Sequence, residues 1–203
     1  MFFFVYIYAM NFLAHLYLSP NNPQIIIGNF IADHVKGNKF KHLPENVQKG
    51  IHLHRAIDTF TDTNAIVRTS KRRLHERYGH YGGVIIDIFY DHFLAKNWKN
   101  YSQIPLDIFT KGVYQLLQKN TNILPEKTLE LLPYMVQYNW LYNYQYKDGI
   151  RDVLNGMNRR TKGKSKMNLA IEDLNLYYTD LQKDFQAFML QLMDFTTTEI
   201  QKL

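Results

Sequence analysis

Acidic and imidazole side chains interrupt four otherwise apolar stretches within the first 92 residues of the chain. Burying a carboxylate or an imidazolium is costly unless the group is paired or bound to a metal. A fold that buries all four groups is therefore expected to bring them together. We predict one shared hydrophilic site inside a helical core, built from residues 11–15 (NFLAH), 32–34 (ADH), 52–58 (HLHRAID) with Asp62, and 87–92 (DIFYDH).

Helical spacing of apolar residues runs through nearly the whole sequence, and no long stretch alternates as a strand would. At 203 residues the chain is long enough for one domain with a sizeable core. The sequence predicts an all-α fold, a single-domain helical bundle. Helices are expected over residues 10–18 (capped by Asn11), 24–35, 44–63, 67–78, 84–98, 148–158 and 169–200, with Pro105 and Pro125 as further starts and Pro133 as a start or kink.

The composition restricts the chemistry and the partners. There are no cysteines, which excludes disulfides and thiolate metal sites and leaves histidine and carboxylate as ligands. This fits a reducing compartment, and we predict a cytoplasmic location. The net charge of +6 favours an acidic partner, such as a nucleic acid, an anionic membrane or an acidic protein. Ordinary solubilising charge is the alternative interpretation.

The amino-terminal stretch, residues 2–18, is almost wholly apolar, and no lysine or arginine precedes Lys36. A spanning helix needs about 20 apolar residues, and a secretory signal needs a basic segment in front of its apolar one. We therefore predict no membrane span and no targeting segment. Residues 1–9 are interpreted as an extension ahead of a single helical domain over residues 10–203, or as an apolar segment packed on the core.

The predicted helix over residues 44–63 carries polar groups on its apolar face. Val47, Ile51, His54 and Asp58 are spaced by four, three and four residues, which places them on one side of a helix. His54 and Asp58 are then neighbours one turn apart. They are either metal ligands, or a buried histidine–aspartate hydrogen bond or ion pair supported by Arg55.

The predicted helix over residues 84–98 is apolar nearly all round, yet it contains Asp87, Asp91 and His92. Two carboxylates one turn apart repel each other unless a cation or a proton lies between them. The alternatives are the capping of a neighbouring helix or pairing with Arg55 or Arg72.

His15 and Asp33 are single polar groups in apolar surroundings. His15 fits either a satisfied core histidine or a ligand. Asp33, near the negative end of a helix, fits either a loop anchor or a ligand.

Together these groups form an oxygen- and nitrogen-rich set suited to Mn²⁺, Mg²⁺ or Fe²⁺. The sequence has no H-E-x-x-H motif and no phosphate-binding P-loop. It also lacks the G-x-S-x-G motif and any cysteine nucleophile. These absences argue against a zinc protease, a nucleotide kinase, a serine hydrolase and a cysteine-dependent enzyme.

Several segments resemble the acyl carrier protein phosphodiesterases, also called acyl carrier protein hydrolases. The resemblance runs in order along nearly the whole chain, from Met10 to about Phe188. Its segments are residues 10–16 (MNFLAHL), 28–33 (GNFIAD), 50–58 (GIHLHRAID) with 60–62 (FTD), 91–95 (DHFLA) with Trp98, and 153–157 (VLNGM).

The resemblance implies an all-helical fold distantly related to the HD-type metal phosphohydrolases. It also implies Mn²⁺-dependent removal of 4′-phosphopantetheine from holo acyl carrier protein, a reaction of fatty acid and lipid metabolism. Its implied metal ligands are His15, Asp33, His54 and Asp58, with Asp33, Asp91 and His92 as catalytic residues. The chain departs from the HD pattern, because Asp33-His34 and Asp91-His92 have the acid before the histidine.

In this metal-dependent hydrolysis, we expect Asp91 or His92 to orient the attacking water or to protonate the departing serine oxygen. Arg55, Arg72 and Arg73 are the predicted substrate-binding residues. An acyl carrier protein is acidic, by the same implication, and basic residues of this chain are expected to steer it. The set consists of Lys36, Lys39, Lys41, Arg68, Lys71, Arg72, Arg73 and Arg77. A solvated helix face is the alternative interpretation of those at 68–77.

Two other functions stay open at this stage. The first is an HD-like phosphohydrolase that acts on a nucleotide or another small phosphate ester at the same site. The second is a non-catalytic basic helical module that binds nucleic acid. Interior carboxylates at Asp87 and Asp91 argue against the second, because a duplex-binding surface has no need of them.

Overall fold

The computed structural model describes residues 12–203, and this part of the chain is one all-α domain without strands, as predicted. The longer helices are α3 (Glu45–Thr63), α4 (Ala65–Tyr78), α5 (Gly82–Lys96), α6 (Leu106–Lys119), α7 (Glu126–Gln137), α9 (Lys147–Arg160) and α11 (Tyr178–Ile200). The shorter ones are α1 (Phe12–Tyr17), α2 (Pro23–Ile31), α8 (Trp140–Asn143) and α10 (Ala170–Leu176). Single 3₁₀ turns, η1 to η5, cover Ala32–His34, Gly79–Tyr81, Trp98–Asn100, Thr121–Ile123 and Met167–Leu169.

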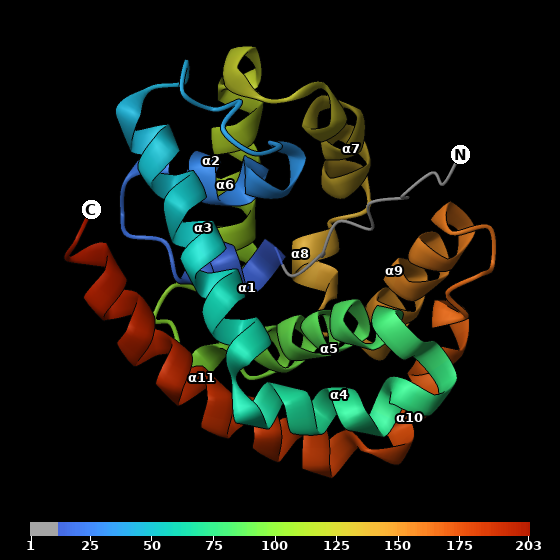
Figure 1. Ribbon diagram of the computed structural model, residues 1–203. Helices are drawn as coiled ribbons and strands as arrows, with labels where there is room; N and C mark the ends of the chain where they lie inside the picture. The colour runs from blue at the N-terminus through green and yellow to red at the C-terminus, as the bar shows by residue number, and fades with distance from the viewer. Residues whose placement is uncertain (1–11) are drawn as a thin grey trace.

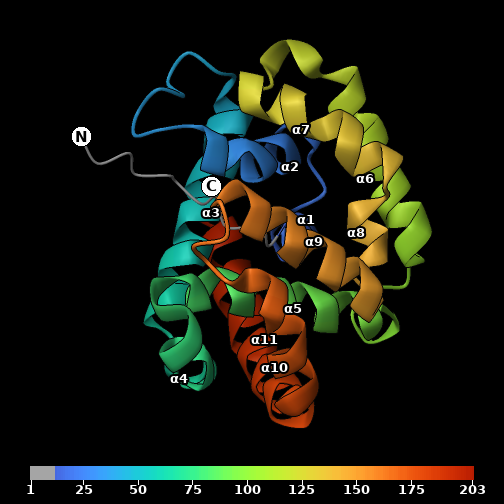
Figure 2. The same cartoon turned by 90° about the vertical axis from the view of Figure 1, so that its right-hand side faces the viewer.

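The short helix α1 lies near the centre of the molecule, where it packs on α2 and α5 (Figure 1). The long helix α11 crosses α3, α4 and α5, and helices α7, α8 and α9 form another side of the molecule (Figure 2). This arrangement places α1, α2, α3 and the turn η1 around one interior region.

Helices α2 and α3 approach each other very closely because a glycine lies on each side of the contact. A Cβ atom on Gly28 would lie 2.1 Å from the carbonyl oxygen of Val47, and one on Gly50 would lie 2.2 Å from that of Ile25. Side chains larger than hydrogen are excluded at such distances. The close approach brings the backbone of Asn29 against His54.

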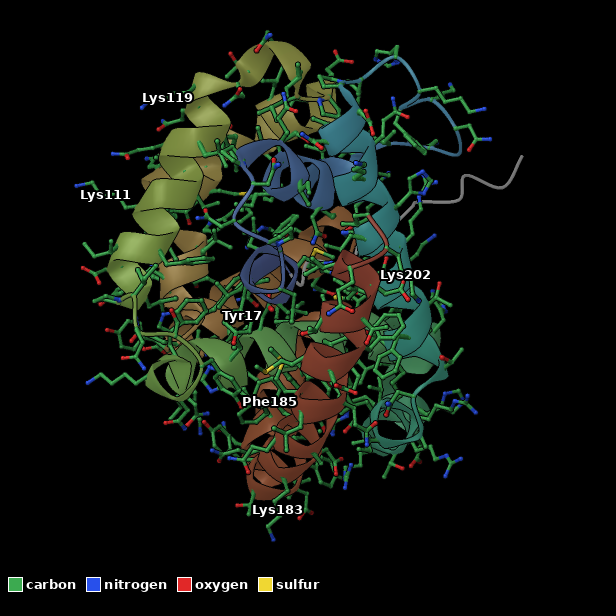
Figure 3. The ribbon with its side chains drawn as sticks, turned by 90° about the vertical axis from the view of Figure 1, so that its left-hand side faces the viewer. Tyr17, Lys111, Lys119, Lys183, Phe185 and Lys202 are labelled. Carbon is green, nitrogen blue, oxygen red and sulfur yellow. The ribbon has the colours of Figure 1, made fainter. Side chains whose placement is uncertain are left out.

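Aromatic side chains fill the space between the helices. Tyr101 contacts both Tyr17 and Phe185, with ring centroids 6.2 and 6.0 Å apart. Figure 3 shows Tyr17 on α1 and Phe185 on α11, whereas Lys111 and Lys119 project outward from α6. The many large aromatics of the sequence therefore act as interhelical packing groups.

Buried and half-buried polar contacts attach α4 to the carboxy-terminal helices. Asp184 accepts hydrogen bonds from Ser70 and Arg73, and Asp173 accepts them from Tyr78 and Arg77. Arg73 and Arg77 are thus engaged within the protein.

Most helix boundaries agree with the sequence prediction. Pro44, Pro105 and Pro125 each immediately precede a helix, and Pro133 lies inside α7, which continues to Gln137. The helix expected over residues 24–35 ends at Ile31 and continues as η1.

The helix expected over residues 169–200 is divided at Tyr177 into α10 and α11. Its two parts pack on different neighbours, α10 on α9 and α11 on α3 and α4. One straight helix would not make both sets of contacts. The proposed cap Asn11 and the apolar residues 1–9 lie outside the described residues. None of the described helices is long and apolar enough to cross a membrane.

Candidate metal centre

Two helices and one turn bring polar side chains together at the interior region around α1. His15 comes from α1, Asp33 from η1, and His54 and Asp58 from α3. Both imidazoles are almost completely buried, with exposed fractions of 1% for His15 and 4% for His54. Their rings stack with centroids 3.9 Å apart and planes inclined by 19°. We call these four side chains the His–Asp cluster.

The Nε2 atoms of both rings face carboxylates. His15 Nε2 lies 3.2 Å from Asp58 Oδ1, and His54 Nε2 lies 3.2 Å from Asp58 Oδ2 and 3.3 Å from Asp33 Oδ1. The Asp58 side chain is 38% exposed, so the cluster opens to solvent on that side. Asp58 therefore bridges the two imidazoles and has access to a ligand from outside.

Asn29 fixes the other nitrogen of each ring. Its backbone carbonyl accepts a hydrogen bond from His54 Nδ1 at 2.8 Å, and its side-chain Oδ1 accepts one from His15 Nδ1 at 2.9 Å. The orientation of its amide follows from Nδ2, which donates to the carbonyl of His15 and to Ser19 Oγ, both at 2.9 Å. Each neutral imidazole therefore has its proton on Nδ1 and its lone pair on Nε2.

This arrangement needs a positive charge between the Nε2 atoms and the carboxylates. A lone pair that faces a carboxylate oxygen at about hydrogen-bond distance is repelled unless a proton or a cation lies between them. One ligand atom each from His15, His54 and Asp58 lies within 4.8 Å of the others, a spacing that suits one ion. Histidine whose Nδ1–H is fixed by an oxygen is the usual form of a metal ligand. The donor set fits a divalent cation.

The electrostatics of the protein alone also favour a positive charge at the cluster. Burial opposes charge on His54, but hydrogen bonds to Asp33 and Asp58 prevail and raise the pKa of His54 to about 10. Burial and the neighbouring His54 lower the pKa of His15. The two imidazoles hold the pKa of Asp58 well below its usual range, despite its burial. The metal-free cluster thus keeps a proton on His54, where a metal would otherwise carry the charge.

Asp91 and His92 do not join the cluster. The two oxygens of Asp91 accept hydrogen bonds from the backbone N–H groups of Leu13 and Ala14, each at 2.9 Å, and so hold the start of α1. Burial raises the pKa of Asp91 well above its usual range, although these bonds oppose the rise.

His92, on α5, contacts the residue that follows α8 and a residue of α11. Its Nδ1 donates to the carbonyl of Tyr144 at 2.7 Å, and its Nε2 lies 3.0 Å from the hydroxyl of Tyr178. Burial lowers the pKa of His92 to about 4. Asp91 and His92 thus contact other parts of the fold, and their catalytic roles stay predictions.

Asp87, one turn before Asp91, lies in the electrostatic field of the cluster. Burial raises its pKa to about 7, and the negative charges of Asp58, Asp62 and Asp33 act in the same direction against Lys71. The sequence analysis included Asp87 in one of the four segments of the predicted site but assigned it no catalytic or metal-binding role.

The three predicted substrate-binding arginines have different surroundings. Arg55 donates to the carbonyl of Gly37 at 2.7 Å, and its guanidinium lies 4.9 Å from the centre of the Phe40 ring. It therefore holds the loop after η1. Arg73 pairs with Asp184, whereas Arg72 is exposed on α4. The structure brings none of these three guanidinium groups into the His–Asp cluster.

Asn29 is the residue of this region that the sequence analysis overlooked. It is fully buried and contacts both imidazoles, yet a single amide in an apolar helix is a weak signal. Its place in residues 28–33 (GNFIAD), one of the segments that resemble the family, was the signal available in the sequence.

Comparison with known proteins identifies a family. The family model described as acyl carrier protein phosphodiesterase matches residues 10–192. Curated proteins with that same name are similar over 91% of this chain. Those from Photorhabdus laumondii and Klebsiella pneumoniae are each 33% identical, over 94% and 96% of their own lengths. The one from Shigella boydii is 34% identical over 96% of its length. No solved structure gave a significant match.

Proposed function

Because the chain belongs to the acyl carrier protein phosphodiesterase family, we propose that it hydrolyses the phosphodiester that joins 4′-phosphopantetheine to holo acyl carrier protein, with a divalent metal at the His–Asp cluster. The observation that carries the metal site is the pair of Nε2 atoms that face carboxylates while Asn29 occupies both Nδ1 atoms. The products are apo acyl carrier protein and 4′-phosphopantetheine.

His15, His54 and Asp58 are the proposed metal ligands, and Asp33 is the proposed fourth, because its Oδ1 faces the same nitrogen of His54 as Asp58. A set of two imidazoles and carboxylates suits Mn²⁺, with Mg²⁺ and Fe²⁺ as alternatives. When bound, such an ion lowers the pKa of a water molecule and polarises a phosphoryl oxygen.

The protein contributes orientation. Asn29 holds both imidazoles in one tautomer, and Asp91 holds the start of the helix that carries His15. We propose that Asp91 acts through this contact as a positioning residue. The partly exposed carboxylate of Asp58 marks the side from which the substrate phosphate approaches.

The basic charge supports an acidic protein partner, and we propose that the two proteins meet in the cytoplasm. Arg73, Arg77 and Lys71 already form ion pairs within the protein. The exposed basic groups left from the predicted set include Lys39 and Lys41 in the loop after η1. We expect added salt to raise KM for the carrier protein more than it changes kcat. A KM that is independent of salt would contradict electrostatic steering.

The proposed reaction is tested by the intact mass of holo acyl carrier protein after incubation with the enzyme. We expect loss of the phosphopantetheine mass with Mn²⁺ and no loss with a chelator. Asp58→Asn and Asp33→Ala should abolish turnover while helix content stays unchanged. Asp62→Asn is the matched control, because Asp62 is an exposed acid one turn further along α3 that pairs with Lys71. Turnover by Asp58→Asn at the wild-type rate would refute the site.

A further inference from the structure

A large cleft lies outside the His–Asp cluster and is lined by residues of α7, α8 and α9. Figure 2 shows the side of the molecule that these three helices form. Its volume is about 680 Å³, which lies within the usual range for organic ligands, about 300–1,000 Å³. Aromatic and amide side chains are prominent in its walls, among them Tyr134, Tyr138, Trp140, Asn143 and Asn155.

One end of the cleft adjoins the turn that carries Asp33. His34 follows Asp33 in η1, and its Nδ1 lies 2.6 Å from Thr128 Oγ1 on α7. Lys127, beside Thr128, and Arg160 at the end of α9 both line the cleft, and their positive charges reach His34. The end of the cleft that carries these two cations, its cationic end, is therefore the end nearest to η1, the turn that carries Asp33.

The chemistry of the cleft matches one part of the substrate. Pantetheine is an uncharged chain with a branched apolar segment, two amides and a terminal thiol, and the phosphate is attached at its other end. Leu131, Val153 and Met157 provide apolar contacts, and Asn143 and Asn155 provide amide partners. A phosphate belongs at the cationic end, next to the turn that carries Asp33.

The cleft also accounts for a sequence motif that the metal centre does not use. Residues 153–157 (VLNGM) resemble the family, but they lie on α9, away from the elements of the His–Asp cluster. Four of the five, Val153, Asn155, Gly156 and Met157, line the cleft.

We propose that the cleft between α7, α8 and α9 binds the pantetheine arm of holo acyl carrier protein and so places the phosphodiester at the His–Asp cluster. This inference rests on the proposed function, because that function supplies the substrate. The cleft then determines which phosphodiesters the enzyme accepts.

Gly156 allows the cleft to be filled with little risk to the fold. Among the described residues, a Cβ on Gly156 would meet one heavy atom within 4 Å, Arg159 Nη2 at 3.9 Å. Glycine is also the weakest helix former after proline, so a side chain here favours α9. Gly156→Leu is therefore the test variant. Gly112→Leu on α6 is its matched control, because no described atom lies within 4 Å of a Cβ there and the position is outside the cleft.

Three readouts distinguish the cleft from the metal centre. Gly156→Leu should lower kcat/KM for holo acyl carrier protein about tenfold or more, whereas Gly112→Leu leaves it unchanged. Hydrolysis of bis(p-nitrophenyl) phosphate, a diester without the arm, should be equal in both variants and the wild type. Free pantetheine should change the fluorescence of Trp140 in the wild-type protein and not in Gly156→Leu.

Equal kcat/KM for holo acyl carrier protein in Gly156→Leu and wild type would overturn the inference. It would equally be overturned if pantetheine failed to bind the wild-type protein, even where Gly156→Leu is impaired, since the cleft would then hold another part of the carrier protein. A wild-type enzyme that releases no phosphopantetheine refutes the proposed function instead, and the pantetheine titration still decides the inference.

Discussion

Replacing Asn29 by alanine separates the support of the His–Asp cluster from its ligands. The substitution removes the side-chain acceptor for His15 Nδ1 and the donor to the His15 carbonyl, whereas His54 keeps its bond to the backbone carbonyl of residue 29. A buried polar group without a partner costs about 1–3 kcal/mol. His15 Nδ1 is left as one such group, whereas the His15 carbonyl still accepts a hydrogen bond from Ser19 Oγ. We therefore expect the free energy of unfolding to fall by about 1–3 kcal/mol.

The same substitution should weaken metal binding, because His15 loses the hydrogen bond that fixes its tautomer. Loss of such a support lowers metal affinity about 10–100-fold. Mn²⁺ affinity is measured by electron paramagnetic resonance, and stability by urea denaturation in chelator.

Asn22→Ala is the matched control for this experiment. Asn22 caps the same helix by accepting hydrogen bonds from the N–H groups of Gln24 and Ile25. Its loss should cost about 1 kcal/mol and leave the Mn²⁺ affinity unchanged. Equal Mn²⁺ affinities for Asn29→Ala and the wild type would refute the role of Asn29.

Three further predictions follow from the contacts. Gly28→Ala should destabilise the protein by about 1–3 kcal/mol, because its Cβ would meet the Val47 carbonyl; urea denaturation showing no loss would contradict the close packing. Burial raises the pKa of Asp87 from 3.8 to about 7, so the stability it contributes is present below pH 4 and lost as pH rises through 7. This amounts to at most about 4 kcal/mol. In the presence of a chelator, the stability of Asp87→Asn relative to the wild type should therefore increase between pH 5 and pH 8. A difference in stability that stays constant over this range would refute this. Mn²⁺ binding at pH 7 should release a proton from His54, whose pKa is about 10 without metal; calorimetry in buffers of different ionisation enthalpy that detects no release would contradict it.

The starts of several helices could be predicted, because residues next to them in the sequence determine where they begin. Pro44, Pro105 and Pro125 precede their helices as expected, since proline has no N–H to lose at a helix start. The division at Tyr177 could not be predicted, because it depends on which neighbours α10 and α11 contact. Periodicity describes one helix at a time and carries no information on its partners.

The candidate site could be predicted in part for the same reason. The convergence of His15, Asp33, His54 and Asp58 was expected from the cost of burying them apart, and the structure brings them together. Asp91 is also buried, but it accepts hydrogen bonds from two backbone N–H groups instead of joining the cluster. Residue type alone does not distinguish a carboxylate that holds a helix start from one that binds a metal.

The most direct test of the account is anomalous diffraction at the manganese edge from crystals of the protein soaked in Mn²⁺. We predict a peak between His15 Nε2, His54 Nε2 and the carboxylate of Asp58, and no peak there in Asp58→Asn crystals. Mn²⁺ bound elsewhere, with the three side chains in place and no density between them, would contradict the central claim.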